Sequence, residues 1–286
     1  MSILRVRHIT SYAYRNPVSL GEHRLMFRPR DAHDQRLISA ELEITPEPAA
    51  MRWVYDVFGN LITIVDFEGE TTTLRVETSL VLEHTPSLPF EIEDSAMQWP
   101  FDYDASIAPD VAPFLRPHHP ASEIDDWARQ FTGGGRIATG HLLFTMTNAI
   151  SDGFAYSRRL SPGTQLPLET LALHKGTCRD FALLMMEACR SLGLAARFVT
   201  GYLYVPSRDV AERRGGGATH AWVQVFLPGA GWVEFDPTNG IVGSRDLIRV
   251  GVAREPSQAK PLSGSFSGPR EDYLGMDVEV QVTRDV

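Results

Sequence analysis

Three residues of the sequence, Cys178, His220 and Asp236, supply the side chains of a cysteine-based catalytic triad. In such a triad a thiolate attacks an acyl carbon, an imidazole moves the proton, and a carboxylate orients the imidazole. Each residue alone is weak evidence, because a lone cysteine is usually a small core residue and an aspartate before proline is usually a turn residue. Their order and their local surroundings together favour nucleophilic catalysis.

Cys178 stands where a helix is predicted to begin. Thr177 and Asp180 form the spacing of a capping box, and an apolar stripe follows at helical spacing until Gly193 ends it: Phe181, Leu184, Met185, Ala188, Cys189 and Leu192. Unpaired N–H groups and the positive end of the helix dipole favour an anionic thiolate at this position. We therefore predict Cys178 as the nucleophile. Asp180 is assigned to the cap alone, with about 1 kcal/mol lost on its removal.

Cys189 is the internal control. It lies in the middle of the predicted helix between apolar neighbours, so we interpret it as a core residue. About eleven helical residues at roughly 1.5 Å each separate it from Cys178, too far for a disulfide. Two cysteines that cannot pair fit a reducing compartment.

His220 and Asp236 fall on two runs, 219–227 and 231–238, that read as a β-hairpin with its turn at 228–230. A three- or five-residue loop places both side chains on one face of the hairpin, within roughly 5–8 Å between Cα atoms. A two- or four-residue loop without a bulge would place them on opposite faces. We predict the same-face register.

The N-terminal part reads as β structure. Period-two alternation occurs at 4–8, 37–44 and 74–82, and residues 56–60 form a turn between two strand-like runs. The basic residues of this part favour a solvated face or interdomain contacts over a ligand site: Arg24, Arg28, Arg30 and Arg36.

The segment 86–120 is rich in proline, and we predict that it is an irregular connection containing the domain boundary. The domains expected are an N-terminal β-sandwich-like domain at 1–90 and a core at 91–286 that ends in a closing strand. Within the core we expect helices at 121–131, 137–151 and 168–173, a mobile flap at 206–217, and a surface loop at 244–270. The closing strand is expected at 276–282.

Composition narrows the class of protein. The chain has 286 residues and a formal net charge of −9 without a block of Lys or Arg, which argues against a nucleic-acid partner. It has no apolar run of 18 residues and no secretory leader pattern, so we expect neither a membrane partner nor a membrane span. These features predict a cytoplasmic protein. The oligomeric state is not indicated.

The motifs Gly-Thr-Cys-Arg-Asp-Phe-Ala at 176–182, His-Ala-Trp at 220–222 and Phe-Asp-Pro-Thr-Asn-Gly at 235–240 resemble those of the bacterial transglutaminase-like superfamily. The resemblance implies an α+β fold: a papain-like core, in which the cysteine helix packs on an antiparallel sheet, preceded by an all-β domain. It implies that Cys178, His220 and Asp236 are nucleophile, general base and acid, and orienting residue. Tyr156 and Trp222 fall at positions that could line the acyl pocket. No cofactor and no metal are expected.

The motifs imply that the partner is a peptide or protein amide substrate. They imply thiol acyl chemistry on peptide or glutaminyl amides through a thioester, but they leave the acyl acceptor open. Water gives a protease or amidase, and an amine gives a crosslinking enzyme. We favour hydrolysis, because no aromatic-rich approach channel is visible beyond Tyr156 and Trp222. The alternative is an inactive member of the superfamily that serves as a binding module.

Overall fold

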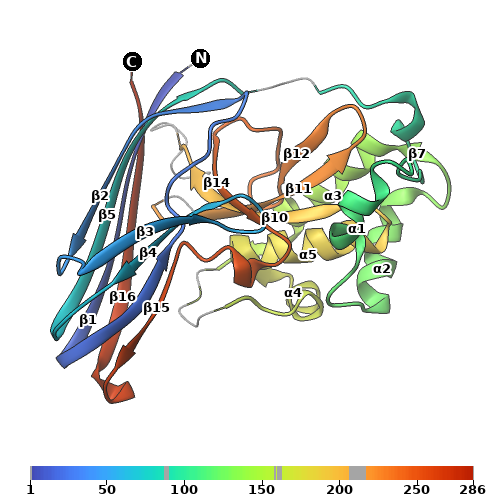
Figure 1. The fold of residues 1–286 in the computed structure, drawn as a ribbon. Helices are drawn as coiled ribbons and strands as arrows, with labels where there is room; N and C mark the ends of the chain where they lie inside the picture. Colours follow the sequence, from blue (N-terminus) through green and yellow to red (C-terminus); the bar gives the residue numbers. More distant parts are fainter. Residues whose placement is uncertain (1, 87–89, 158, 160–162, 206–216, 286) are drawn as a thin grey trace.

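The computed structural model describes the chain except for residues 1, 87–89, 158, 160–162, 206–216 and 286. It is an α+β protein in which a large sheet stands beside a smaller helix-covered sheet (Figure 1). This confirms the predicted fold class. The predicted flap lies almost entirely outside the described residues. In the part of the chain that is described, no helix is both long and apolar enough to cross a bilayer.

The N-terminal sheet is built around one long strand. Its path is β2-β5-β1-β4-β3, made of β1 (Ser2–Leu25), β2 (Gln35–Thr45), β3 (Ala50–Tyr55), β4 (Leu61–Asp66) and β5 (Thr71–His84). The first half of β1 pairs with β5, and its second half pairs with β4. The predicted turn between β3 and β4 is present: Asp56 accepts hydrogen bonds from the N–H groups of Phe58 and Asn60, and Gly59 takes a φ of 74°.

Two C-terminal strands, β15 (Leu262–Ser267) and β16 (Tyr273–Arg284), also pair with β1. The expected strand at 276–282 is therefore real, but it joins the N-terminal sheet and not the sheet of the core. Our prediction that it closes the core at 91–286 is wrong on this point. Figure 1 shows the last strand running beside the first, with both termini at one end of the sheet. The 90/91 boundary itself stays a prediction.

The proline-rich segment contains a helix that we did not predict. It is α1 (Ala108–Leu115), which has Pro109 in its first turn and Pro113 inside it. Proline fits a first turn because that N–H has no helical acceptor. The other elements between the N-terminal sheet and the cysteine helix are β6 (Gln98–Trp99), α2 (Ser122–Arg129), β7 (Ile137–Ala138), α3 (Thr139–Gly153), β8 (Ala155–Tyr156), α4 (Pro167–Leu173) and β9 (Lys175–Gly176).

The core sheet has the order β13-β12-β11-β10-β14. Its strands are β10 (Ala196–Leu203), β11 (His220–Leu227), β12 (Gly231–Asp236), β13 (Ile241–Val242) and β14 (Leu247–Ala253). The strand β14 lies within 244–270, which we expected to be a loop. Helix α5 (Cys178–Ser191) packs on β10 and β11, and alternate residues of β11 such as Val223 and Val225 are fully buried against it. The residues predicted to form the site are thus carried by a packed helix-and-sheet layer.

Candidate active site

Cys178 is the first residue of α5, as the sequence predicted. Thr177 is the N-cap in an extended conformation, and both hydrogen bonds of the capping box with Asp180 are present. Only 6% of Cys178 is exposed, so the thiol lies at a helix start but just beneath the surface. Because the first N–H groups of a helix have no acceptor within it, the Cys178 N–H is placed to stabilise an oxyanion.

Asp180 does more than close the cap. Its carboxylate is fully buried and accepts hydrogen bonds from the N–H of Thr177 at 2.8 Å and the N–H of Gln165 at 2.7 Å. Arg159 adds a bidentate ion pair at 2.9 and 3.1 Å. A Cβ on Gly176 would lie only 2.9 Å from the Cβ of Asp180, so glycine is needed there. Asp180 therefore fixes the chain on both sides of Cys178.

We expect Asp180→Asn to lower the free energy of unfolding by about 3 kcal/mol, because it leaves the Arg159 charge without its buried partner. This replaces the smaller value expected from the cap alone. The measurement is the urea midpoint at neutral pH. Asp285→Asn is the matched control, since Asp285 forms a bidentate pair with Arg5 at the surface and its loss should leave the midpoint unchanged. Equal shifts for the two variants would contradict the buried role of Asp180.

His220 and Asp236 are brought together by the predicted hairpin register. Leu227 pairs with Gly231 across a three-residue turn, which puts both side chains on the same face. The His220 Nε2 donates to Asp236 Oδ2 at 2.8 Å, and both side chains are fully buried. The Nδ1 atom is buried and has no close partner among the described residues, while the Cys178 thiol lies near enough to interact with the ring. Nδ1 is thus the nitrogen available to the thiol.

The electrostatics of the pair favour an ionised histidine. Burial opposes the charge of His220, but Asp236 and then Cys178 raise its pKa to about 10. Burial likewise opposes the charge of Asp236, yet His220 and further donors hold the pKa of this carboxyl below its ordinary value. At neutral pH this arrangement favours an imidazolium held against a carboxylate.

Asn239, part of the Phe-Asp-Pro-Thr-Asn-Gly motif, is a further member of the site, and the sequence alone assigned it no role. Its Nδ2 donates to Asp236 Oδ2 at 2.9 Å and lies 3.5 Å from His220 Nε2. The N–H of Thr238 donates to Asp236 Oδ1 at 2.9 Å. The signal was available in the Asp-Pro-Thr-Asn turn, since an aspartate that begins a turn accepts hydrogen bonds from the residues that follow it.

Trp222 is fully buried and its ring stacks against His220, with centroids 5.9 Å apart and planes at 28°. It belongs to a buried apolar cluster with Val199 and Leu203. A Cβ on Gly201 would lie 2.7 Å from its ring, so the glycine makes room for it. Trp222 thus packs against the histidine ring and has no exposed surface, and its contact with substrate stays a prediction.

Tyr156 is half-buried on β8, which pairs in parallel with β9 and places Tyr156 beside Gly176. Tyr156 therefore lies beside the residue that precedes Cys178 by two positions. Its role in substrate binding stays a prediction. No group of three or more His, Cys, Asp or Glu side chains able to hold a metal ion occurs among the residues that the structure describes.

Comparison with known proteins gives two family matches. Residues 4–83 match the bacterial transglutaminase-like N-terminal region, and residues 125–237 match the transglutaminase-like superfamily. An uncharacterized protein of Mycobacterium leprae, ML0607, is 31% identical over 98% of each chain, and Rv2569c of Mycobacterium tuberculosis is 29% identical over 97% of this chain and 91% of its own.

Among solved structures, a candidate cysteine protease from Cytophaga hutchinsonii has the same fold. Its TM-score is 0.74 at 19% identity, and the match covers 98% of this chain and 90% of that one. These findings confirm the family predicted from the Cys, His and Asp motifs. The chain belongs to the transglutaminase-like superfamily and carries the N-terminal region of its bacterial members.

Proposed function

We propose that this protein catalyses acyl transfer from peptide or glutaminyl amides through a thioester on Cys178, with water as the preferred acceptor. The observation that carries the proposal is the buried His220–Asp236 pair, 2.8 Å between Nε2 and Oδ2, beside a thiol at the start of α5. In this role Cys178 is the nucleophile, His220 the general base and acid, and Asp236 the residue that orients the ring.

The first half-reaction forms the thioester. The Cys178 thiolate attacks the amide carbon, and the N–H groups at the start of α5 stabilise the oxyanion. The protonated Nδ1 of His220 then donates its proton to the leaving amine, and the C–N bond breaks. In the second half-reaction His220 takes a proton from water, the resulting hydroxide attacks the thioester, and the C–S bond breaks with return of the thiolate.

Two observations support water over an amine. Trp222, the aromatic residue nearest to His220 in the sequence, is fully buried against the imidazole ring and forms no exposed wall around the thioester. Tyr156, the other aromatic residue predicted for the acyl pocket, is half-buried, and exclusion of water is what an amine acceptor requires.

The test starts from an amide peptide library, read for release of the amine. The best donor is then incubated with and without a millimolar primary amine, and both acyl products are quantified by mass spectrometry. We expect the free acid to predominate in both reactions. Predominance of the new amide at low amine concentration would overturn hydrolysis while leaving the thioester chemistry intact. Absence of any product with Cys178 unmodified would favour the binding module.

A further inference from the structure

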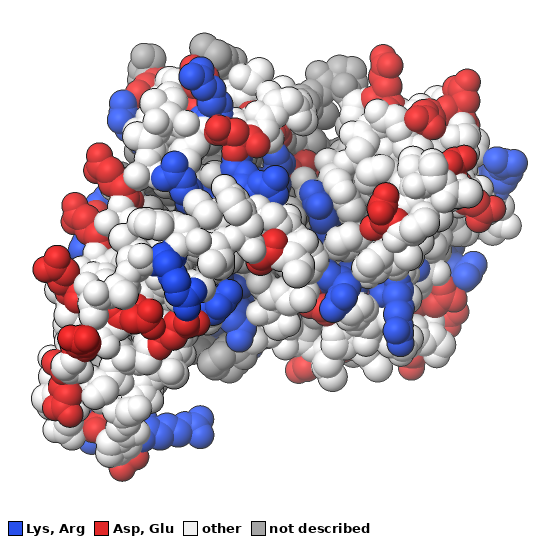
Figure 2. All heavy atoms as spheres, viewed as in Figure 1, with Lys and Arg blue, Asp and Glu red and all other residues white. Residues whose placement is uncertain are grey.

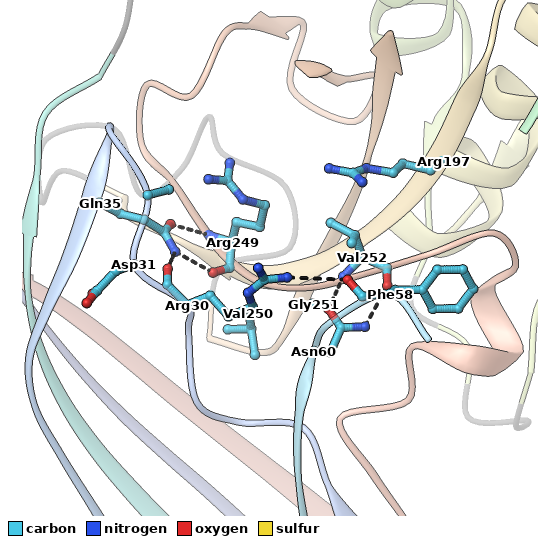
Figure 3. Close-up of a pocket in the computed structure, with 11 residues that line it drawn as sticks. Arg30, Asp31, Gln35, Phe58, Asn60, Arg197, Arg249, Val250, Gly251 and Val252 are labelled. Atoms are coloured by element: carbon cyan, nitrogen blue, oxygen red, sulfur yellow. Dashed lines mark hydrogen bonds between the residues drawn. The ribbon is translucent and has the colours of Figure 1, made fainter. Parts of the chain in front are cut away.

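Two adjoining cavities lie where the N-terminal sheet meets the core. Their volumes are about 190 and 270 Å³, and both are lined by Arg197 of β10 and Arg249 of β14. The segment 30–35 and the tip of the β3–β4 hairpin complete the first cavity, as Figure 3 shows. Figure 2 shows Lys and Arg side chains gathered over this junction.

The walls of the first cavity are fixed by two amide side chains that pair with the outer edge of β14. Gln35 exchanges two hydrogen bonds with the backbone of Arg249, at 2.8 and 3.0 Å. Asn60 does the same with Val252, at 2.7 and 2.9 Å. These bonds satisfy an exposed strand edge, and between them they hold the lining in one place.

Two of the three guanidinium groups at the cavities lack an anionic partner among the described residues. Arg197 donates through Nε to Gln224 at 2.7 Å and lies 4.0 Å from the centre of the Trp232 ring, so its Nη groups are free of any acceptor in that part of the chain. Arg30 has a single bond of 3.3 Å to the carbonyl oxygen of Phe58. Arg249, by contrast, is paired with Asp34 and Glu234.

Among the described residues, no acidic side chain in the lining forms an ion pair with Arg197 or Arg30. Asp34 and Glu234 are engaged by Arg249, and Asp31 accepts from the Leu37 N–H. Figure 3 shows Asp31 directed away from the three guanidinium groups. Burial and then the neighbouring Arg249 lower the pKa of Arg197 to about 9; Glu234 opposes this shift in part, and Arg30 adds a smaller lowering effect. A partly buried cation in this state gains from a bound anion.

We propose that these cavities bind a small organic anion whose carboxylate or phosphate group is held by Arg197 and Arg30. Guanidinium groups suit both anions because their N–H donors match two oxygens at once. The face of Trp232 beside Arg197 offers an apolar flank for the rest of the ligand. The volumes lie below the roughly 300 Å³ at which drug-sized pockets begin, so the ligand is small.

The site is distinct from the reaction centre. Arg197 pairs with Gln224 in the sheet, whereas His220 pairs with Gly201, four residues further along. At about 3.3 Å per residue the two positions are about 13 Å apart. The proposal therefore does not depend on acyl transfer, and its test is a binding measurement.

Calorimetric titration with inorganic phosphate and, separately, with succinate tests the site at constant ionic strength. We expect millimolar or tighter binding of at least one anion, weakened about tenfold by Arg197→Gln and several-fold by Arg30→Gln. Arg36→Gln is the control, because Arg36 is exposed, pairs with Glu83 and lies outside both linings. Binding of phosphate alone or succinate alone identifies the anionic group.

Absence of heat with both anions, or equal binding by the wild type and both cavity variants, would overturn the proposal. Arg197 also orients Gln224, so its substitution could disturb folding. Arg30→Gln removes only one long hydrogen bond to the protein, and it keeps the test decisive in that case.

Discussion

Replacing Cys178 with alanine is expected to lower turnover by at least about 10⁴-fold, because no other group in the site can form the thioester. The fold should persist, since the substitution removes one sulfur atom at the first residue of α5 and leaves the Thr177–Asp180 cap intact. The measurement is amine release from a peptide donor, with circular dichroism and a thermal melt on the same sample.

Cys189→Ala is the matched control for this variant. Cys189 is fully buried in the middle of α5, and burial raises the pKa of its thiol to about 12. Its replacement should preserve turnover and cost about 1 kcal/mol of stability, as small truncations in a core do. Near-normal turnover in Cys178→Ala, or loss of turnover in Cys189→Ala, would contradict the assignment.

Asp236→Asn is expected to lower turnover by about 10⁴-fold without unfolding the protein. The Thr238 N–H bonds Oδ1, so the oxygen of the asparagine amide would stay there and its nitrogen would take the place of Oδ2. A donor would then face His220 Nε2, which is 2.8 Å away, and the neutral ring would carry its proton on Nδ1. In that tautomer Nδ1 cannot accept a proton from the thiol.

The pH dependence provides a second readout for the same variant. The pKa of His220 is raised to about 10, so kcat/KM of the wild type should decrease on the alkaline side with an apparent pKa near 10. Without the Asp236 charge this apparent pKa should move toward the ordinary histidine value of about 6.5. Asp277→Asn, on the exposed part of β16, is the control and should change neither the turnover rate nor the apparent pKa of the alkaline decrease. An unchanged apparent pKa in Asp236→Asn would show that a group other than His220 titrates in the alkaline decrease.

The same shifts determine when the pair stabilises the fold. A raised histidine pKa contributes stability that is complete below about pH 6.5 and is lost as the pH rises through about 10. A lowered aspartate pKa contributes stability that is present above about pH 4 and is lost on acidification. The contribution of the pair to the free energy of unfolding is therefore complete between about pH 4 and about pH 6.5.

Local signals in the sequence predicted the parts of the site that depend on local geometry. The cap at Thr177 and Asp180 and the three-residue hairpin turn each involve only neighbouring residues, and both are present as predicted. What the sequence could not specify were partners distant in the chain. The buried ion pair of Asp180 with Arg159 and the stacking of Trp222 on His220 depend on how separate segments pack together.

The same limit explains the errors in the fold. Nothing near Tyr273–Arg284 indicates that this strand pairs with β1, more than 250 residues earlier in the chain. The strand β14 was missed because its flanks are rich in glycine, serine and proline, and its outer edge is satisfied by side chains of the N-terminal region. Such edge contacts leave no periodic pattern in the sequence.

The rate of alkylation by iodoacetamide at each cysteine, read by peptide mapping of the native protein at neutral pH, tests the central claim most directly and requires no substrate. We predict that Cys178 reacts at least about 100-fold faster than the buried Cys189, and that His220→Ala slows Cys178 by about tenfold or more while leaving Cys189 unchanged. Equal rates at the two cysteines, or a Cys178 rate that is indifferent to His220, would contradict a thiol activated by the His220–Asp236 pair.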